Sequence, residues 1–169
     1  DQDEALSMAD LVAVLDRGRL VQVGTPAQIY EAPASRWLAQ FVGGAVVMPG
    51  TWMGDTVRCA LGDVPARLGA GEVARLGDPV ELALRPEHLV LAADPDDASA
   101  GGSVALVRHV AYFGHDALVT LDLPGLAEPI EARVLGGAGV VPDSEVRVRA
   151  ARPGLAFAAG RDVAPLAAS

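Results

Sequence analysis

The chain has 169 residues, of which 51% are hydrophobic and 4% aromatic, and it carries a net charge of −9. All 13 basic residues are arginines, so the lysine that a P-loop places on the phosphates of a nucleotide is absent. The acidic balance and the few aromatic rings argue against a nucleic-acid-binding protein. No apolar run approaches the roughly 20 residues needed to span a bilayer.

The first elements expected are a short helix and a hairpin. Asp1 and Glu4 have the spacing of a capping box, and good helix formers follow, which predicts a helix over 2–9. The apolar run 11–15 is typical of a buried strand. After an Asp-Arg-Gly-Arg turn, residues 20–23 alternate apolar and polar, as the returning strand of a hairpin should.

Two more helices are expected next. Thr25 and Gln28 form a second capping box around a proline at the first helical position. Pro33 separates this helix from another over 35–42, which Gly43 can terminate. The apolar face of this last helix is predicted to consist of Trp37, Leu38, Phe41 and Val42.

From Ala45 onward the helical periodicity stops and short β-like runs appear between Gly, Pro and Asp turns. This pattern predicts a mainly β region, a small barrel or sandwich. The stretch 94–102 is expected to be an exposed loop with a cluster of strands on each side. The predicted strands are 46–53, 56–61, 79–84, 104–113, 116–123, 129–134, 146–151 and 155–158.

Neither the single cysteine nor the histidines predict a chemical site. Cys59 has no partner for an internal disulfide and is expected to be a partly buried thiol of a cytosolic protein. His109 and His115 lie six residues apart, with Asp116 adjacent, and His88 is distant in sequence. Because no single helix or strand face joins such positions, no metal site is expected.

The first 43 residues resemble the end of the nucleotide-binding domain of ABC transporters. The resemblance rests on D-x-x-E-A-L at 1–6 and G-T-P-x-x-I-Y at 24–30. It implies that Asp1 directly follows a switch histidine that the chain lacks. It also implies that the parent protein uses ATP and Mg²⁺, whereas this piece has no P-loop, Walker B strand or signature motif. No catalytic or nucleotide-binding residue, no cofactor and no ATP hydrolysis are therefore expected here.

The remainder resembles the transport-associated OB (TOBE) domain, a regulatory module behind the ATPase of importers. The matching stretches are L-R-P-E-H-L at 84–89, V-A-Y-F-G at 110–114 and F-V-G at 41–43. The resemblance implies two units: an α/β remnant of the ATPase domain over 1–43 and an OB-like TOBE barrel over 45–162.

This resemblance implies the regulatory and dimer-contact region of an importer's ATP-binding subunit. The parent would be a homodimer beneath membrane subunits, cytoplasmic and peripheral to the inner face of the membrane. The Tyr-Phe-Gly-His-Asp-Ala form at 112–117 is closer to ferric-iron and polyamine importers than to maltose importers.

Four residues are the regulatory or interface candidates. Arg85 is expected to pair with Glu87 or another carboxylate, a structural use of its charge. Tyr112 and Phe113 alternate across a strand, so at least one is expected in the core while the other can face a partner.

Two other function classes remain open. A stand-alone OB-like module could bind an oxyanion or another small ligand through converging cations, although the net charge opposes this. The available cations are Arg85, Arg108, Arg133, Arg147 and Arg149. An OB-fold nucleic-acid binder is the least consistent with the charge.

Overall fold

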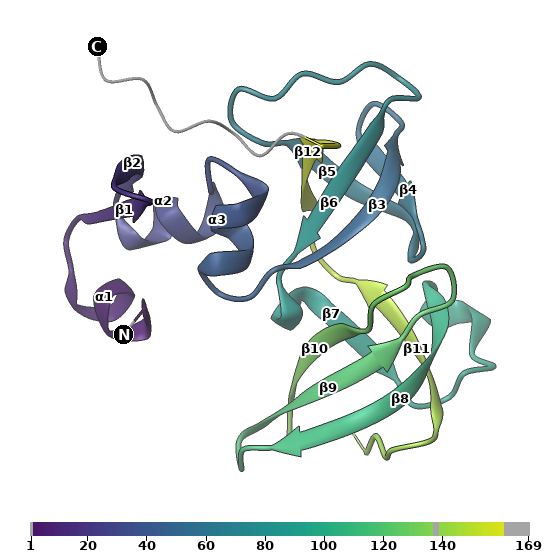
Figure 1. Cartoon of the computed structure of the whole chain (residues 1–169). Coiled ribbons are helices and arrows are strands. Elements are labelled where there is room, and N and C mark those ends of the chain that lie inside the picture. The colour runs from purple at the N-terminus through teal and green to yellow at the C-terminus, as the bar shows by residue number, and fades with distance from the viewer. Residues whose placement is uncertain (1, 137–138, 161–169) are drawn as a thin grey trace.

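The structure is a computed structural model that describes residues 2–136 and 139–160. An N-terminal segment of helices and one hairpin lies beside two stacked five-stranded β sheets (Figure 1). The prediction of a mainly β chain is confirmed. None of the described helices has both the length and the apolar character that crossing a membrane requires.

The N-terminal segment follows the predicted order of elements to within one or two residues. It consists of α1 (Gln2–Met8), β1 (Val12–Asp16), β2 (Arg19–Gly24), α2 (Pro26–Glu31) and α3 (Arg36–Phe41). β1 and β2 pair antiparallel as the expected hairpin. Asp1 lies outside the described residues, so its capping box with Glu4 stays a prediction.

The predicted capping box of α2 is confirmed, and α3 begins with a capping serine that was not predicted. The amide of Gln28 donates to Thr25 Oγ1 at 3.3 Å, and the amide of Thr25 donates to Gln28 Oε1 at 2.9 Å. Ser35 Oγ accepts from the amide of Leu38 at 3.1 Å. These bonds satisfy donors that a helix start otherwise leaves without partners.

The predicted apolar face of α3 is divided between core and surface. Leu38 and Val42 are buried in a small core with Val14 of β1 and Ile29 of α2. Phe41 is 45% exposed, and its ring stacks on Trp37 with centroids 5.0 Å apart. The face is therefore only partly buried.

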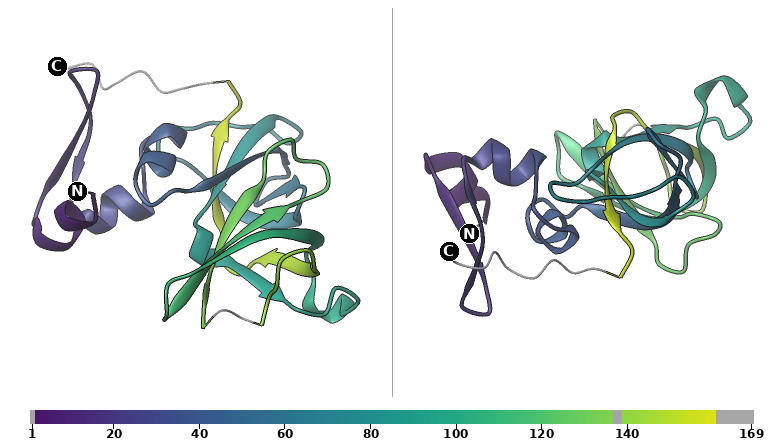
Figure 2. Two further views of the ribbon diagram at one scale, coloured as in Figure 1. Left: turned by 60° about the horizontal axis from the view of Figure 1, so that its bottom comes forward. Right: turned by 90° about the horizontal axis from the view of Figure 1, so that it is seen from above.

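The first sheet is a closed barrel in the order β12-β5-β4-β3-β6. Figure 2 shows it end-on as a ring, with the N-terminal segment to one side. The last strand closes the ring, because it pairs parallel to β5 and antiparallel to β6. The strands are β3 (Val46–Trp52), β4 (Thr56–Cys59), β5 (Gly62–Leu68), β6 (Pro79–Leu84) and β12 (Gly154–Ala158).

The second sheet has the order β10-β9-β8-β11-β7, and all of its pairs are antiparallel. Its end strands, β10 and β7, also lie close to each other, so the sheet is rolled towards a barrel. The strands are β7 (Leu89–Ala92), β8 (Ser103–Tyr112), β9 (Asp116–Asp122), β10 (Ile130–Leu135) and β11 (Glu145–Ala150). Two single helical turns, η1 (Pro86–His88) and η2 (Ala98–Ala100), complete the elements.

Two strands were not predicted from the sequence. β5 begins at Gly62 and contains Pro65, which reads as turn sequence. The proline is accommodated because the pairing with β12 starts one residue later, at Ala66. β7 is four residues long and follows η1 directly, so its apolar run reads as part of the proline turn. The stretch 94–102 is a mostly exposed connection, as predicted, with η2 inside it.

The core joins the parts of the molecule. One continuous cluster of buried apolar side chains runs through both sheets. A second cluster, formed by Ala39, Ala45, Ala83 and Phe157, joins α3 to the outside of the first barrel. The N-terminal segment therefore packs on the barrel through three alanines, which allow a close approach, and the fully buried ring of Phe157.

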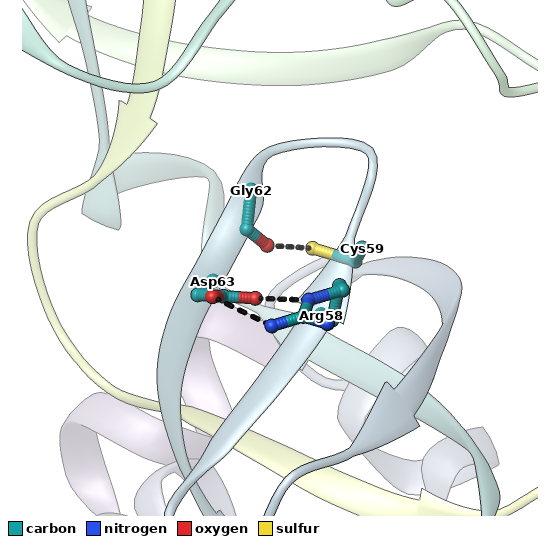
Figure 3. A network of polar contacts seen from close by, with 4 residues as sticks. All are labelled: Arg58, Cys59, Gly62 and Asp63. Atoms are coloured by element: carbon teal, nitrogen blue, oxygen red, sulfur yellow. Dashed lines mark hydrogen bonds and ion pairs between the residues drawn. The ribbon is translucent and has the colours of Figure 1, made fainter. Parts of the chain in front are cut away.

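The β4–β5 hairpin carries the single cysteine (Figure 3). Cys59 is half-buried, as predicted, and its thiol lies 3.5 Å from the Gly62 carbonyl oxygen. Burial raises the pKa of this thiol, which lowers its reactivity. Beside it, Arg58 contacts both carboxylate oxygens of Asp63, at 2.9 and 3.2 Å. Both side chains are largely exposed, so this pair adds little stability.

Candidate functional site

Arg85 lies where β6 ends and η1 begins, and it is only 7% exposed. Pro86 follows it and disfavours a helical conformation for its predecessor, so Arg85 is extended (φ −76°, ψ 140°). The proline begins the single helical turn η1 (Pro86–His88). This geometry places the arginine between the first barrel and the N-terminal helices.

The guanidinium of Arg85 binds three backbone carbonyls. Nη1 donates to the carbonyl oxygens of Ala39, at 2.8 Å, and of Val42, and Nη2 donates to that of Tyr30. These carbonyls lie at the C-terminal ends of α3 and α2, where carbonyls lack partners within the helix. A positive charge is also favoured there by the helix dipole.

Tyr30 and Gly43 complete the enclosure of this charge. The guanidinium lies over the Tyr30 ring, 3.9 Å from its centroid, and Tyr30 Oη donates to Glu87 Oε1 at 2.5 Å. Gly43 has φ +77°, and a Cβ there would lie 2.4 Å from Tyr30 Cε2 and 3.1 Å from Arg85 Nη1. We call Tyr30, Gly43, Arg85 and Glu87 the Arg85 clasp.

The clasp changes the acidity of its members. Burial lowers the pKa of Arg85, although arginine stays charged at neutral pH. Burial, followed by the hydrogen bond and the negative charge of Glu87, raises the pKa of Tyr30 to about 12. Tyr30 is therefore a neutral donor and Arg85 a buried cation, stabilised by carbonyls and an aromatic face.

The expected pairing of Arg85 with a carboxylate is wrong. Its hydrogen bonds go to carbonyls, while Glu87 accepts from Tyr30 instead. The helix ends offer three oxygens, of which only that of Ala39 also accepts from a backbone amide, that of Ala45 at 3.1 Å. A guanidinium has enough N–H groups to bind all three.

Tyr30 and Gly43 were missed as site residues, although the sequence contained a signal for them. Tyr30 ends the G-T-P-x-x-I-Y stretch, Gly43 ends F-V-G, and Arg85 and Glu87 belong to L-R-P-E. The structure brings these three separate stretches to one point, which sequence separation alone does not reveal.

Two other arginines form polar contacts between the same helices and the barrel. Arg36 Nη1 of α3 lies 2.6 Å from Glu81 Oε1 of β6, and both side chains are mostly buried. Arg67 of β5 donates to the Glu31 carbonyl oxygen at the end of α2, at 2.9 Å. Polar contacts to α2 and α3 thus come from β5, β6 and the start of η1.

The core position expected for Tyr112 or Phe113 is wrong, because both are exposed, by 65% and 59%. The Phe113 amide donates to the Asp116 carbonyl at 2.8 Å, which closes the β8–β9 turn at the outer end of the second sheet. Leu135, 85% exposed, ends the neighbouring strand opposite Asp116. We call Tyr112, Phe113 and Leu135 the apolar tip.

The histidines of this region do not gather around a common point. His115 Nε2 lies 3.5 Å from Asp116 Oδ1, and the buried Asp116 also pairs with Arg133 of β10. Within residues 2–136 and 139–160, no group of three His, Cys, Asp or Glu side chains is placed to hold a metal ion.

Comparison with known proteins finds relatives of this sequence. Residues 82–157 match the TOBE domain. The chain is 38% identical over 164 residues to the Fe(3+) ions import ATP-binding protein FbpC 1 of Rhodococcus jostii, covering 94% of the chain and 44% of the relative. It is 39% identical over 130 residues to the spermidine/putrescine import ATP-binding protein PotA of Thermobifida fusca, covering 72% and 33%.

A solved structure shares the fold. The cytoplasmic molybdate-binding protein ModG, crystallised with molybdate, superimposes with a TM-score of 0.53 at 18% identity, covering 67% of this chain and 95% of that one. At this identity the likeness shows the fold alone. The chain spans less than half the length of the import proteins that it matches. Residues 82–157 belong to the TOBE-domain family, and the chain as a whole is related to the ATP-binding subunits of ABC importers.

Proposed function

We propose that this chain is the regulatory and dimer-contact C-terminal region of the ATP-binding subunit of an ABC importer. Residues 1–43 would be the end of the ATPase domain and 45–162 the TOBE region, with residues 161–162 outside the described structure. The observation that supports this best is the Arg85 clasp, because its atoms come from both units. A contact of this kind can carry a movement of the ATPase end into the barrels.

The chemistry of transport would belong to the rest of the parent protein. ATP and Mg²⁺ would bind there, and the subunit would work under membrane subunits at the cytoplasmic face. Ferric iron or a polyamine is the transported solute we favour, since the related proteins are named for these substrates. Having no lysine for a P-loop, the chain itself should give no saturable heat on calorimetric titration with ATP.

The apolar tip is the proposed dimer contact. Three large apolar side chains are exposed together there, and such patches commonly mark interaction sites. Light scattering after size exclusion should show a dimer of the chain. Replacing Tyr112 and Phe113 by serine should convert the dimer to a monomer.

Val73 and Leu76 provide the matched control, since they are 82% and 72% exposed in the β5–β6 connection. Replacing both by serine removes a similar apolar area and should leave the dimer intact. Two results would contradict a dimer contact at the apolar tip. One is a wild-type chain that stays monomeric at high concentration, and the other is a dimer that persists after Tyr112 and Phe113 are replaced by serine.

A further inference from the structure

A cavity of about 610 Å³ lies beside the Arg85 clasp, between the end of α2 and the outside of the first barrel. One wall is formed by α2 and the chain that follows it, and the other by β5, β6, β12 and the turn before β12. Its volume is in the range of sites that take small organic ligands. The walls of the cavity therefore come from the same two units that the clasp connects.

The charge around this cavity differs from that of the whole chain. Three arginines and two glutamates line it, whereas the chain has 13 basic and 22 acidic residues. Glu87 is engaged by Tyr30, and Arg85 by the helix carbonyls. Of the lining charges that are not engaged in this way, two are cations, Arg67 and Arg152, and one is an anion, Glu31, so a positive balance remains at the rim.

Both of these rim arginines have N–H groups that are available to bind a ligand. Arg67 gives one hydrogen bond, to the Glu31 carbonyl oxygen, and has no carboxylate partner among the described residues. Arg152 makes no hydrogen bond or ion pair with any residue of the described part. Both side chains belong to exposed residues, so an incoming anion can reach them.

The cavity also has an apolar part and a further polar group. His88 lines it, and burial, the largest effect, lowers the pKa of this imidazole, so at neutral pH it offers an uncharged donor and acceptor. The apolar lining comes from Pro33, Ala39, Ala45, Ala83, Leu84, Pro153 and Leu155. An inorganic ion would leave this apolar surface uncovered.

We infer that this cavity binds a small organic anion, a carboxylate or a phosphate monoester with an apolar body, whose charged end lies between Arg67 and Arg152. The apolar body would cover the alanine, proline and leucine surface between α2 and β12. A ligand that touches both walls stabilises their contact, so binding would strengthen the attachment of the N-terminal segment to the barrel. This inference goes beyond the proposed function and does not depend on a dimer.

Titration calorimetry of the chain with phenyl phosphate, benzoate and inorganic phosphate tests it. We expect saturable binding of phenyl phosphate or benzoate, and the tighter of the two identifies the preferred head group. Inorganic phosphate should bind at least about tenfold more weakly than the tighter probe, because it cannot cover the apolar surface. The tighter probe should also raise the thermal midpoint.

Variants locate the site. Arg67→Gln and Arg152→Gln should each weaken binding of the tighter probe by about tenfold or more, since each removes a charge-assisted contact. Arg58→Gln is the matched control: it removes one exposed arginine from β4, outside the cavity lining, and should change binding by less than about twofold. Circular dichroism confirms that each variant is folded.

The inference is overturned if neither organic probe binds saturably up to about 10 mM, a concentration that detects even millimolar affinity. It is equally overturned if Arg58→Gln weakens binding as much as the cavity variants, or if inorganic phosphate binds as tightly as the organic probes. These outcomes are separate from the oligomeric state, so the dimer proposal stands or falls on its own.

Discussion

At the scale of single residues, the Arg85 clasp explains why an arginine can be buried without a carboxylate. Its charge faces carbonyls at the ends of α2 and α3 and the face of the Tyr30 ring. Removing the side chain would leave the Val42 and Tyr30 carbonyl oxygens without donors, a cost of roughly 1–3 kcal/mol for each, while the Ala39 oxygen keeps the amide of Ala45. A lysine has the charge but lacks the planar fork that contacts several oxygens at once.

Gly43 is the residue of the clasp that should tolerate substitution least. Gly43→Ala should destabilise the chain by about 2 kcal/mol or more, because a left-handed backbone is strained and the new Cβ strikes Tyr30 and Arg85. Gly44→Ala is the control, since Gly44 also has positive φ but nothing lies within 4 Å of its Cβ position. In urea unfolding, equal losses for the two variants would mean that the close approach at Gly43 is unimportant.

Tyr30 gives the clasp a signature at high pH. Its pKa of about 12 lies above the ordinary value of 10, so its contribution to stability is complete below pH 10 and is lost as the pH rises through about 12. Ultraviolet titration of the two tyrosines should therefore show one of them ionising late. Tyr30→Phe should remove that late step, and a late step that survives would refute the assignment.

At the scale of elements, the helices depend on their surroundings. α2 and α3 have six residues each, which is too short for a stable isolated helix. Their N-terminal ends are satisfied by Thr25 and Ser35, and their C-terminal carbonyls by Arg85. A capping residue is predictable from the sequence because it binds an amide only three residues away. Arg85 binds carbonyls that lie more than forty residues away in the sequence.

The strands, too, differ in whether local sequence or distant pairing determines them. Nearly all the runs with clear alternation were predicted, because one face of each is buried. β5 and β7 were not, since their signals are interrupted by Pro65 or merged with η1. The return of β12 to the first barrel, between β5 and β6, depends on pairing with strands some seventy to ninety residues earlier, and no local pattern encodes it.

Gly69 lies against β12, the strand that closes the first barrel, so a substitution at Gly69 tests how tightly this closure is packed. Its amide donates to Ala156 at 2.9 Å, and a Cβ would lie 2.6 Å from Phe157 Cε1. Gly69→Ala should therefore destabilise the chain by about 1–3 kcal/mol through overpacking. Adding Phe157→Leu should make the alanine less costly than it is alone, and thermal unfolding of both singles and the double gives the coupling. Simple additivity of the two losses would argue against the clash.

At the scale of the whole molecule, the chain has two regions with their own cores and a defined joint. The small core of α2, α3 and β1 is separate from the continuous core of the two sheets. The joint consists of the alanine and phenylalanine cluster, the Arg36–Glu81 pair and the Arg85 clasp. We predict that this clasp makes the N-terminal segment and the barrels unfold as one unit.

The two tryptophans allow the most direct test, because Trp37 lies in α3 and Trp52 in β3 of the barrel. Trp37→Phe and Trp52→Phe leave one fluorescent reporter each, so urea unfolding can be followed separately in the segment and in the barrel. The two transitions should coincide when Arg85 is present. After Arg85→Met the transition reported by Trp37 should move to lower urea while that of Trp52 stays nearly in place. Transitions that still coincide in the Arg85→Met chain would contradict the claim.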